Sequence, residues 1–228
     1  MHQEGIVCVS VGKANACKRV AKIISVIRGS VNLRRHRVFC LNDYHDLIDV
    51  SPRIGVEISP ITFGNVQRVA EFRGLRHVRF FQEYLKQGQH GVYARVGPKV
   101  VGHAWAKVCT DSRCRVNRYM DISCGEALIH ACQVHQPHRG NNIYPVMLVA
   151  LCRRLFSEGR VHRILIDTET HNYASLRGIA KVGFKPLGTG YYLQFMGRLL
   201  FQHFADWGGE VWWDHKPDRT RGISQAHR

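Results

Sequence analysis

The segment Arg139–Asn142, with the sequence Arg-Gly-Asn-Asn, combines a guanidinium group with backbone donors that could bind an anion. It closes a polar loop that starts at His135, and either Asn141 or Asn142 can cap a following helix. The first N–H groups of a helix have no intrahelical partner, and the helix dipole is positive there. A pyrophosphate would therefore fit this turn, with Arg139 as an additional donor. Polar strand-to-helix turns that bind nothing have the same pattern, so the spacing alone leaves both interpretations open.

A strand before this turn and a helix after it would position these donors. From Glu126 to Val134, apolar residues occupy both alternating sets of positions, which indicates a strand that is covered on both faces. After the turn, apolar residues recur at helical spacing as far as Leu155, and Pro145 fits the first turn because a proline there loses no intrahelical bond. The sequence therefore predicts the order strand, turn, helix.

The segment from Arg139 to Tyr144 resembles the acyl-CoA loop of the GNAT (Gcn5-related) N-acetyltransferases. In that family the pattern is Arg or Gln, two residues, Gly, one residue, and then Gly or Ala. Arg139 matches the first position, whereas Asn142 and Tyr144 stand where the family has its second glycine and its Gly or Ala. Divergent members that read Arg-Gly-x-Gly-Ile-Tyr-Pro are similar to this segment. The resemblance implies that acetyl-CoA is bound by Gln133, Val134, His135, Arg139, Gly140, Asn141, Asn142, Ile143 and Tyr144.

A second motif lies downstream, from His171 to Phe184. It follows a short predicted strand at Arg163–Thr168 and is similar to the family's Asn-x-x-Ser/Ala, helix, Lys-x-Gly-Phe segment. The resemblance implies that Asn172 and Ser175 border the CoA arm. Two motifs in the correct order are more specific than either alone, and the resemblance extends over residues 54–204.

The order of the predicted elements indicates a mixed α/β class with an α+β-like arrangement. Strands are predicted at Gly55–Ile58, His90–Val96 and Lys99–Val108, and helices at Phe63–Phe72 and Leu75–Lys86. The resemblance implies the GNAT fold, in which helices cover both faces of a central, mostly antiparallel twisted sheet. We expect three parts: a basic N-terminal extension of helix and connector over 1–52, an acyltransferase domain over 53–206, and a polar tail over 207–228.

The N-terminal extension is strongly basic, and Glu4 is the only acidic residue among the first 40. Val20, Ile23, Ile24 and Ile27 recur at helical spacing among basic residues. Docking on the core of the domain is the usual fate of such a stripe, and we favour it. The alternative is peripheral contact of residues 13–37 with an anionic membrane face.

Composition excludes several other classes of protein. The net charge of +16 suits polyanionic ligands, but no helix-turn-helix, zinc finger or RNA-binding signature is present, so we do not expect nucleic acid as a partner. No apolar run approaches the length of about 18 residues that a membrane span needs, and the start of the chain does not resemble a secretion signal. The eight cysteines lack paired spacing, which indicates reduced thiols, no metal and a cytoplasmic protein.

The resemblance implies a general base on the central strand or a neighbour, and an acid for the leaving thiolate. Glu126 is the first candidate for the base, although it could equally be an ordinary carboxylate at a strand end. His130 is the second candidate, and a satisfied core histidine is the more ordinary interpretation. Many family members have a tyrosine that protonates the leaving thiolate, and Ile179 occupies its place here. Tyr173, which is displaced in sequence, is therefore the candidate acid. Tyr191 and Tyr192 are further candidates.

The predicted function is N-acyl transfer, with an acetyl group as the expected acyl group, from acetyl-CoA to a small-molecule amine or amino sugar of anionic character. Attack should be direct, because no cysteine or serine stands in a nucleophile arrangement. A loose resemblance to transferases of cell-surface polysaccharide or lipid-linked sugars supports this acceptor class. A catalytically inactive GNAT-like module that binds an anionic partner or nucleic acid through its basic surface is the alternative. A third reading keeps the enzyme and replaces acetyl by a longer acyl or an aminoacyl donor. The oligomeric state stays open.

Overall fold

The computed structural model describes residues 31–115, 121–195 and 198–206. The chain divides into two compact units, of which the smaller contains Met1–Arg34 and Tyr191–His203 and the larger contains Arg35–Gly190 and Phe204–Arg228. The strands are β1 Val31–Leu41, β2 Glu57–Pro60, β3 His90–Val96, β4 Lys99–Val108, β5 Arg113–Arg115, β6 Asp121–Ser123, β7 Glu126–Val134, β8 Arg163–Glu169, β9 Lys185–Phe195 and β10 Arg198–Asp206. The α-helices are α2 Ala70–Arg73, α3 Arg76–Lys86, α4 Ile143–Ser157 and α5 Tyr173–Lys181, and the 3-10 helices are η1 Tyr44–Asp46, η2 Val66–Val69 and η3 Gln136–His138.

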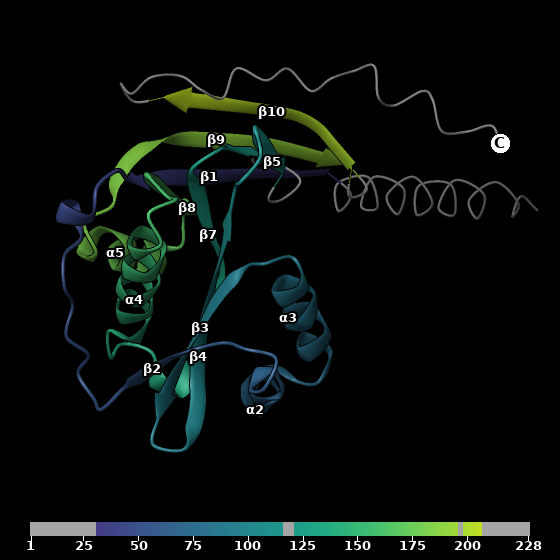
Figure 1. The fold of residues 1–228 in the computed structure, drawn as a ribbon. Helices are drawn as coiled ribbons and strands as arrows, with labels where there is room; N and C mark the ends of the chain where they lie inside the picture. Colours follow the sequence, from purple (N-terminus) through teal and green to yellow (C-terminus); the bar gives the residue numbers. More distant parts are fainter. Residues whose placement is uncertain (1–30, 116–120, 196–197, 207–228) are drawn as a thin grey trace, which may run out of the picture. The chain divides into compact units, whose positions relative to one another are not determined.

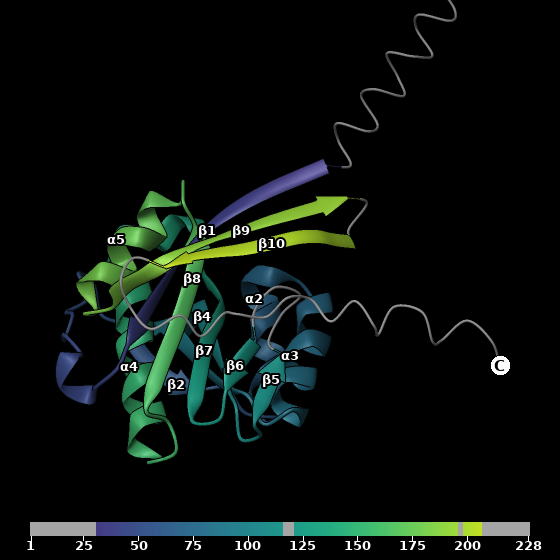
Figure 2. The same cartoon turned by 90° about the horizontal axis from the view of Figure 1, so that it is seen from above.

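Eight strands form one sheet in the order β10-β9-β1-β8-β7-β4-β3-β2, and β5 pairs with β6 in a separate hairpin. Strands β1 and β8, β4 and β7, and the β2-β3-β4 meander pair antiparallel, whereas β7 and β8 pair parallel. Figure 2 shows β8, β7 and β4 side by side. Helices α4 and α5 cover one face of these central strands, and α2 and α3 lie on the other (Figure 1). The predicted fold class, mixed α/β with a mostly antiparallel sheet covered on both faces, is confirmed.

A bulge distorts β7 at Ala131, whose φ is +48°. From His103 to Trp105, two steps along β4, the facing residues on β7 run from Gln133 to His130, which is three steps. The extra residue bends the strand. The described ladder between β7 and β8 ends at Ile129 and Ile166, just before the bulge. Beyond that point the backbone groups of β7 that face β8 lie outside the described ladder, and the two strands split.

Alternation along the central strands assigns their side chains to two faces. Ile164 and Ile166 of β8 pack in the cluster that contains the buried residues of α4 and α5. Leu165, between them, packs instead with Leu128 of β7 and Val38 of β1 in a second cluster. We call the first side of the sheet the α4/α5 face and the second side the α2/α3 face.

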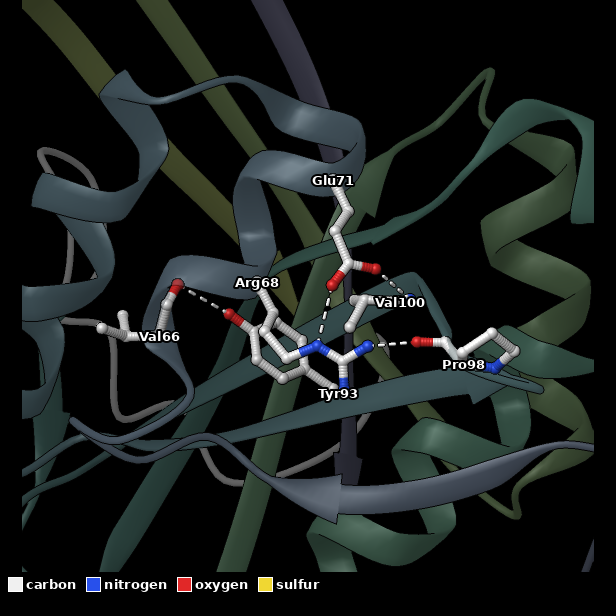
Figure 3. A network of polar contacts seen from close by, with 6 residues as sticks. All are labelled: Val66, Arg68, Glu71, Tyr93, Pro98 and Val100. Carbon is white, nitrogen blue, oxygen red and sulfur yellow. Dashed lines mark hydrogen bonds and ion pairs between the residues drawn. The ribbon is translucent and has the colours of Figure 1, made fainter.

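A polar network fastens the helical segment before α3 to the β3-β4 hairpin on the α2/α3 face (Figure 3). The Tyr93 hydroxyl donates to the Val66 carbonyl at 3.1 Å, and Arg68 donates to Glu71 at 2.8 Å and to the carbonyl of Pro98. The backbone N–H of Val100 donates to the second carboxylate oxygen of Glu71 at 2.7 Å. These bonds hold a segment that is only partly helical. The helix predicted at Phe63–Phe72 is in fact the short η2 followed by the four residues of α2.

Strand β1 begins at Val31, within the part of the chain predicted to be helix and connector, and it pairs with β8 over His36–Leu41. Basic residues over 34–37 hide its first half from pattern analysis, because only the last four residues are apolar and buried. The amphipathic helix predicted before it lies outside the described residues. The division of the chain at residue 52 stays a prediction, although residues 35–41 are part of the sheet. In the smaller unit, the rings of Tyr191 and His203 lie 6.2 Å apart.

Candidate functional site

A pocket of about 690 Å³ opens on the α4/α5 face, between the end of β7, the loop that contains η3, the start of α4 and one side of α5. The lining residues are Arg53, Cys132, Gln133, Val134, His138, Arg139, Gly140, Asn142, Ile143, Tyr144, Pro145, Asn172, Ala174, Ser175, Arg177, Gly178 and Lys181. The structure thus brings together nine of the eleven residues predicted to contact CoA. The two sequence motifs form opposite walls of one pocket.

Two left-handed residues shape the loop before α4. Gly140 has φ +84° and Asn142 has φ +59°, at the position where the family pattern has glycine. Asparagine adopts this conformation more readily than most residues, which explains how the loop turns without the second glycine. The Asn142 side chain is also anchored, because its Nδ2 donates to the carbonyl of Ser51 at 3.1 Å and its Oδ1 accepts from Lys181 Nζ at 2.9 Å.

Helix α4 presents its N-terminus to the pocket. Its first N–H groups lack intrahelical acceptors, and the positive end of its dipole lies there. Pro145 in the first turn has no N–H to lose. Arg139 spans from the loop to the strand, because its Nε donates to the carbonyl of Val134 at 3.2 Å. Backbone donors and a guanidinium group therefore converge on one corner of the pocket.

The charged side chains that line the pocket are all basic. They are Arg53, Arg139, Arg177 and Lys181, and no carboxylate is among the lining residues. Arg53 is held in place by its backbone N–H, which donates to the carbonyl of Asn141 at 3.0 Å. Arg177 and Lys181 are one helical turn apart on α5. A ligand with several phosphate groups matches this arrangement of charge.

The start of α5 is tied to the start of α4 through side chains. Asn172 caps α5 by accepting from the Ser175 backbone N–H at 3.2 Å, and the Ser175 hydroxyl donates to the Tyr144 hydroxyl at 3.2 Å. Burial raises the pKa of Tyr144 well above its ordinary value. The Tyr144 ring lies so close to Gly178 that a Cβ there would be 2.5 Å from Cδ1 of the ring. Tyr144 therefore occupies the gap between the helices that Gly178 leaves.

Two predicted contact residues support the loop without lining the pocket. His135 donates its backbone N–H to the carbonyl of Val101 at 2.7 Å, which fixes the exit of the chain from β7. Asn141 donates from Nδ2 to the carbonyl of His138 at 3.2 Å. Their roles in binding stay a prediction.

The predicted base Glu126 lies at the opposite end of β7 from the pocket. Eight residue steps separate it from Val134, about 26 Å in a strand that rises about 3.3 Å per residue. Glu126 is buried, accepts the Ser123 backbone N–H at 2.9 Å and faces Arg163 at 3.6 Å. Burial raises its pKa. The predicted acid Tyr173 is 67% exposed and does not line the pocket, and the catalytic roles of Glu126 and Tyr173 stay predictions.

His130 lies beside the bulge and points to the α2/α3 face, because it alternates in step with Leu128. Its Nε2 is 2.7 Å from Oε1 of Gln89, and the edge of its ring meets Tyr84 with the ring centroids 5.2 Å apart. Burial lowers its pKa to about 4, so it is neutral at physiological pH. In this hydrogen bond His130 Nε2 is the donor, because the amide oxygen of Gln89 only accepts.

Three of the basic residues that line the pocket were not predicted: Arg53, Arg177 and Lys181. Arg177 and Lys181 could have been found from helical spacing, since they share one side of α5 with Ala174 and Gly178. Outside the pocket, Asp167 of β8 directly follows the last residue that pairs with β7. Its carboxylate lies 2.6 Å from Nδ1 of His36 on β1.

Among the described residues, no group of three or more His, Cys, Asp or Glu side chains is arranged to hold a metal ion. None of the helices in the described ranges is long and apolar enough to cross a membrane. The described part of the chain is thus a mixed sheet split between two parallel strands, with a basic pocket at the helix terminus beside the split. The basic lining of this pocket matches a ligand that carries phosphate groups.

Comparison with known proteins identifies the family. The model of the acetyltransferase (GNAT) family matches residues 62–184, just over half of the chain, and the chain belongs to that family. No curated protein sequence matches it significantly.

Solved structures with the same fold are distant in sequence. An acetyltransferase from the GNAT family from Colwellia psychrerythraea is 15% identical with a TM-score of 0.51, over 72% of this chain and 56% of that one. A Drosophila protein is 14% identical with a TM-score of 0.52, over 83% and 59%. The GCN5-related glucosamine N-acetyltransferase region of a fungal multi-domain GH3 β-N-acetylglucosaminidase is 13% identical with a TM-score of 0.53, over 79% and 23%. The chain spans less than two thirds of the length of each of these structures, and the likeness shows the fold alone.

Proposed function

We propose that the protein transfers an acyl group, namely the acetyl group of acetyl-CoA, to the nitrogen of an amine. The observation that carries this proposal is the basic pocket, in which the donors at the start of α4 and the side chains of Arg139, Arg177 and Lys181 surround one cavity. Phosphates of CoA would bind at this corner, because a helix N-terminus and basic side chains together form an anion site. Membership in the GNAT family supports the same assignment.

The pocket extends from this anion corner to the end of β7, where Cys132, Gln133 and Val134 line it. In the proposed complex the pantetheine arm runs toward the split between β7 and β8. Backbone N–H groups of β7 beyond the bulge would then polarise the thioester carbonyl, as oxyanion donors do in other acyl transfers. The acceptor nitrogen attacks the carbonyl carbon directly, and the CoA thiolate leaves.

The acceptor class and the location are also proposals. An amine or amino sugar of anionic character fits the excess of basic residues in the chain, and transfer in the cytoplasm would give access to acetyl-CoA. Competition between acetyl-CoA and longer acyl-CoA donors would test the identity of the acyl group.

Calorimetric titration of the purified protein with acetyl-CoA, CoA and ATP tests the proposal. We expect micromolar binding of acetyl-CoA, weakened by about 10- to 100-fold in Arg139→Ala, since a hydrogen bond to a charged group contributes about 1.5–3 kcal/mol. Arg153→Ala is the matched control, because Arg153 lies on α4 outside the pocket and pairs with Asp49 at 2.5 Å. Absence of acetyl-CoA binding by the wild-type protein would refute the enzyme and favour an inactive binding module.

A further inference from the structure

The α2/α3 face of the sheet holds a pair of titratable side chains at the split between β7 and β8. His36 Nδ1 and Asp167 Oδ2 are 2.6 Å apart, and the two side chains are 15% and 17% exposed. They come from β1 and β8, which are far apart in sequence and antiparallel neighbours in the sheet. Asp167 is the first residue of β8 beyond the described ladder with β7.

The pair lies on the face opposite the pocket. Asp167 is two residues from Leu165, His36 is two residues from Val38, and both of these apolar residues belong to the cluster on the α2/α3 face. His130 reaches the same face from β7 by the same alternation. His36, His130 and Asp167 therefore lie on the α2/α3 face at the split, next along their strands after the buried residues Val38, Leu128 and Leu165.

Asp167 lies close enough to the pocket to act on groups on both sides of the split. Burial lowers the pKa of His130, and the negative charge of Asp167 partly opposes that shift. Burial raises the pKa values of Cys132 and Tyr144, and the same charge adds to both increases. Cys132 and Tyr144 line the pocket. The titratable groups that interact with Asp167 thus include His36 from β1, His130 and Cys132 from β7, and Tyr144 from α4.

In this geometry the coenzyme and the acceptor would approach the thioester carbonyl carbon from opposite faces of the sheet. If the coenzyme reaches the split from the α4/α5 face, as the proposed function requires, the acceptor must reach the thioester from the α2/α3 face. A carboxylate at the split on that second face is placed to meet the incoming nitrogen. An amine is ordinarily protonated at neutral pH and has no free electron pair for attack until a base removes a proton.

We propose that Asp167 is the general base for the acceptor amine and that His36, supplied by the N-terminal strand β1, is its positioning residue. The proposal rests on the proposed acyl transfer. The acceptor ammonium gives one proton to the Asp167 carboxylate, which later releases it to solvent. The nitrogen lone pair forms the C–N bond, the C–S bond breaks with its electron pair on sulfur, and the second proton lost by the nitrogen is taken up by the thiolate through water.

Two nucleophiles that differ in their need for a base test the proposal. Ethanolamine is protonated at neutral pH and needs a base, whereas hydroxylamine is already unprotonated there. With acetyl-CoA as donor and release of CoA as the readout, we expect Asp167→Asn to slow transfer to ethanolamine by roughly 10²- to 10⁴-fold, the usual contribution of general base catalysis. Transfer to hydroxylamine should change by less than about threefold on the same reasoning.

A second variant and a matched control separate catalysis from structure. His36→Gln should shift the pH profile of transfer to ethanolamine and leave the acetyl-CoA dissociation constant unchanged. Asp49→Asn removes an exposed aspartate that pairs with Arg153 outside the pocket, and both rates should stay at the wild-type level. Unchanged acetyl-CoA binding by Asp167→Asn shows that the variant is folded.

Each result decides the assignment. Equal losses with both nucleophiles in Asp167→Asn, with acetyl-CoA binding intact, would overturn the role as base and make the pair a structural bridge between strands. Binding of acetyl-CoA by the wild type without transfer to either nucleophile would overturn it also, while the coenzyme site stands. Absence of acetyl-CoA binding would refute the proposed function itself, and the assignment would fall with it.

Discussion

The two faces of the central sheet are built in different ways. On the α4/α5 face, contiguous segments form an open basic pocket, in which Gly140, Asn142 and the start of α4 present backbone donors. On the α2/α3 face, aromatic and histidine side chains pack densely around Trp105, which is fully buried. One face carries an open pocket, and the other is densely packed around Trp105.

Electrostatics separates the faces as well. The pocket holds four exposed or half-exposed cations and no carboxylate side chain in its lining. The α2/α3 face instead contains neutral histidines, because burial lowers the pKa of His103 to about 3 and that of His130 to about 4. The difference indicates that the first face is suited to hold a charged ligand and the second to exclude water from a reacting group.

Removal of the central side chain of the α2/α3 face should have the largest effect on stability. Trp105→Ala should lower the free energy of unfolding by about 3–5 kcal/mol, because it deletes a buried indole that meets Phe81 and Tyr84 edge to face. Denaturant unfolding measures the loss. An Arg153→Ala variant on the exposed side of α4 should lose less than about 1 kcal/mol. A small loss for Trp105→Ala would mean that this face is not densely packed.

The histidines of the α2/α3 face should make stability depend on pH. The pKa of His103 falls from 6.5 to about 3, mainly by burial and also through Arg73, so the unfolded chain binds a proton more readily than the folded one. This contribution is fully present above pH 6.5 and is lost as the pH falls toward 3, by up to about 1.4 kcal/mol per pH unit. His103→Leu should flatten the dependence between pH 6.5 and 4, measured by denaturant unfolding. His45→Leu, at an exposed position, should leave the wild-type slope. An unchanged slope in His103→Leu would show that His103 is not held neutral.

The same contrast explains which features could be predicted from the sequence. The pocket face was found because its residues are contiguous: Arg139 to Tyr144 and Asn172 to Ser175 each form a local turn with a readable donor pattern. Asn142 adopts the left-handed conformation, so the loop turns as predicted although the second glycine of the family pattern is missing. The side of α5 that carries Arg177 could also have been read from its helical spacing.

The other face depends on strand order, which local patterns do not contain. His36 contacts Asp167, and His130 feels the charge of Asp167, only because β1 pairs with β8 and β8 pairs with β7. Glu126 was favoured as the base because it lies on the central strand, but strand membership does not say which end of the strand meets the split. The bulge at Ala131, where alternation changes phase, was likewise not visible in an otherwise regular pattern.

The contact between α4 and α5 should be sensitive to a single methyl group. Gly178→Ala places a Cβ about 2.5 Å from the Tyr144 ring, so we expect a loss of about 1–2 kcal/mol in stability, together with weaker acetyl-CoA binding. Thermal unfolding and calorimetry measure the two effects. In a Tyr144→Ala background the same Gly178→Ala change should cost much less, because the ring that collides is absent. An equal cost in both backgrounds would show that the collision is not the cause.

Removal of one cation from the pocket should have the smallest effect and should depend on salt. Lys181→Ala loses the 2.9 Å bond to Asn142 and one positive charge, so we expect acetyl-CoA affinity to fall by about 3- to 10-fold at low ionic strength. The difference from wild type should shrink at 1 M salt, where charges are screened within about 3 Å. Lys185→Ala is the control, because Lys185 is exposed and pairs with Asp46 at 3.0 Å outside the pocket. A salt-independent loss would mean that Lys181 acts by holding the left-handed turn at Asn142. Loop geometry would then contribute more than charge to ligand binding on the α4/α5 face.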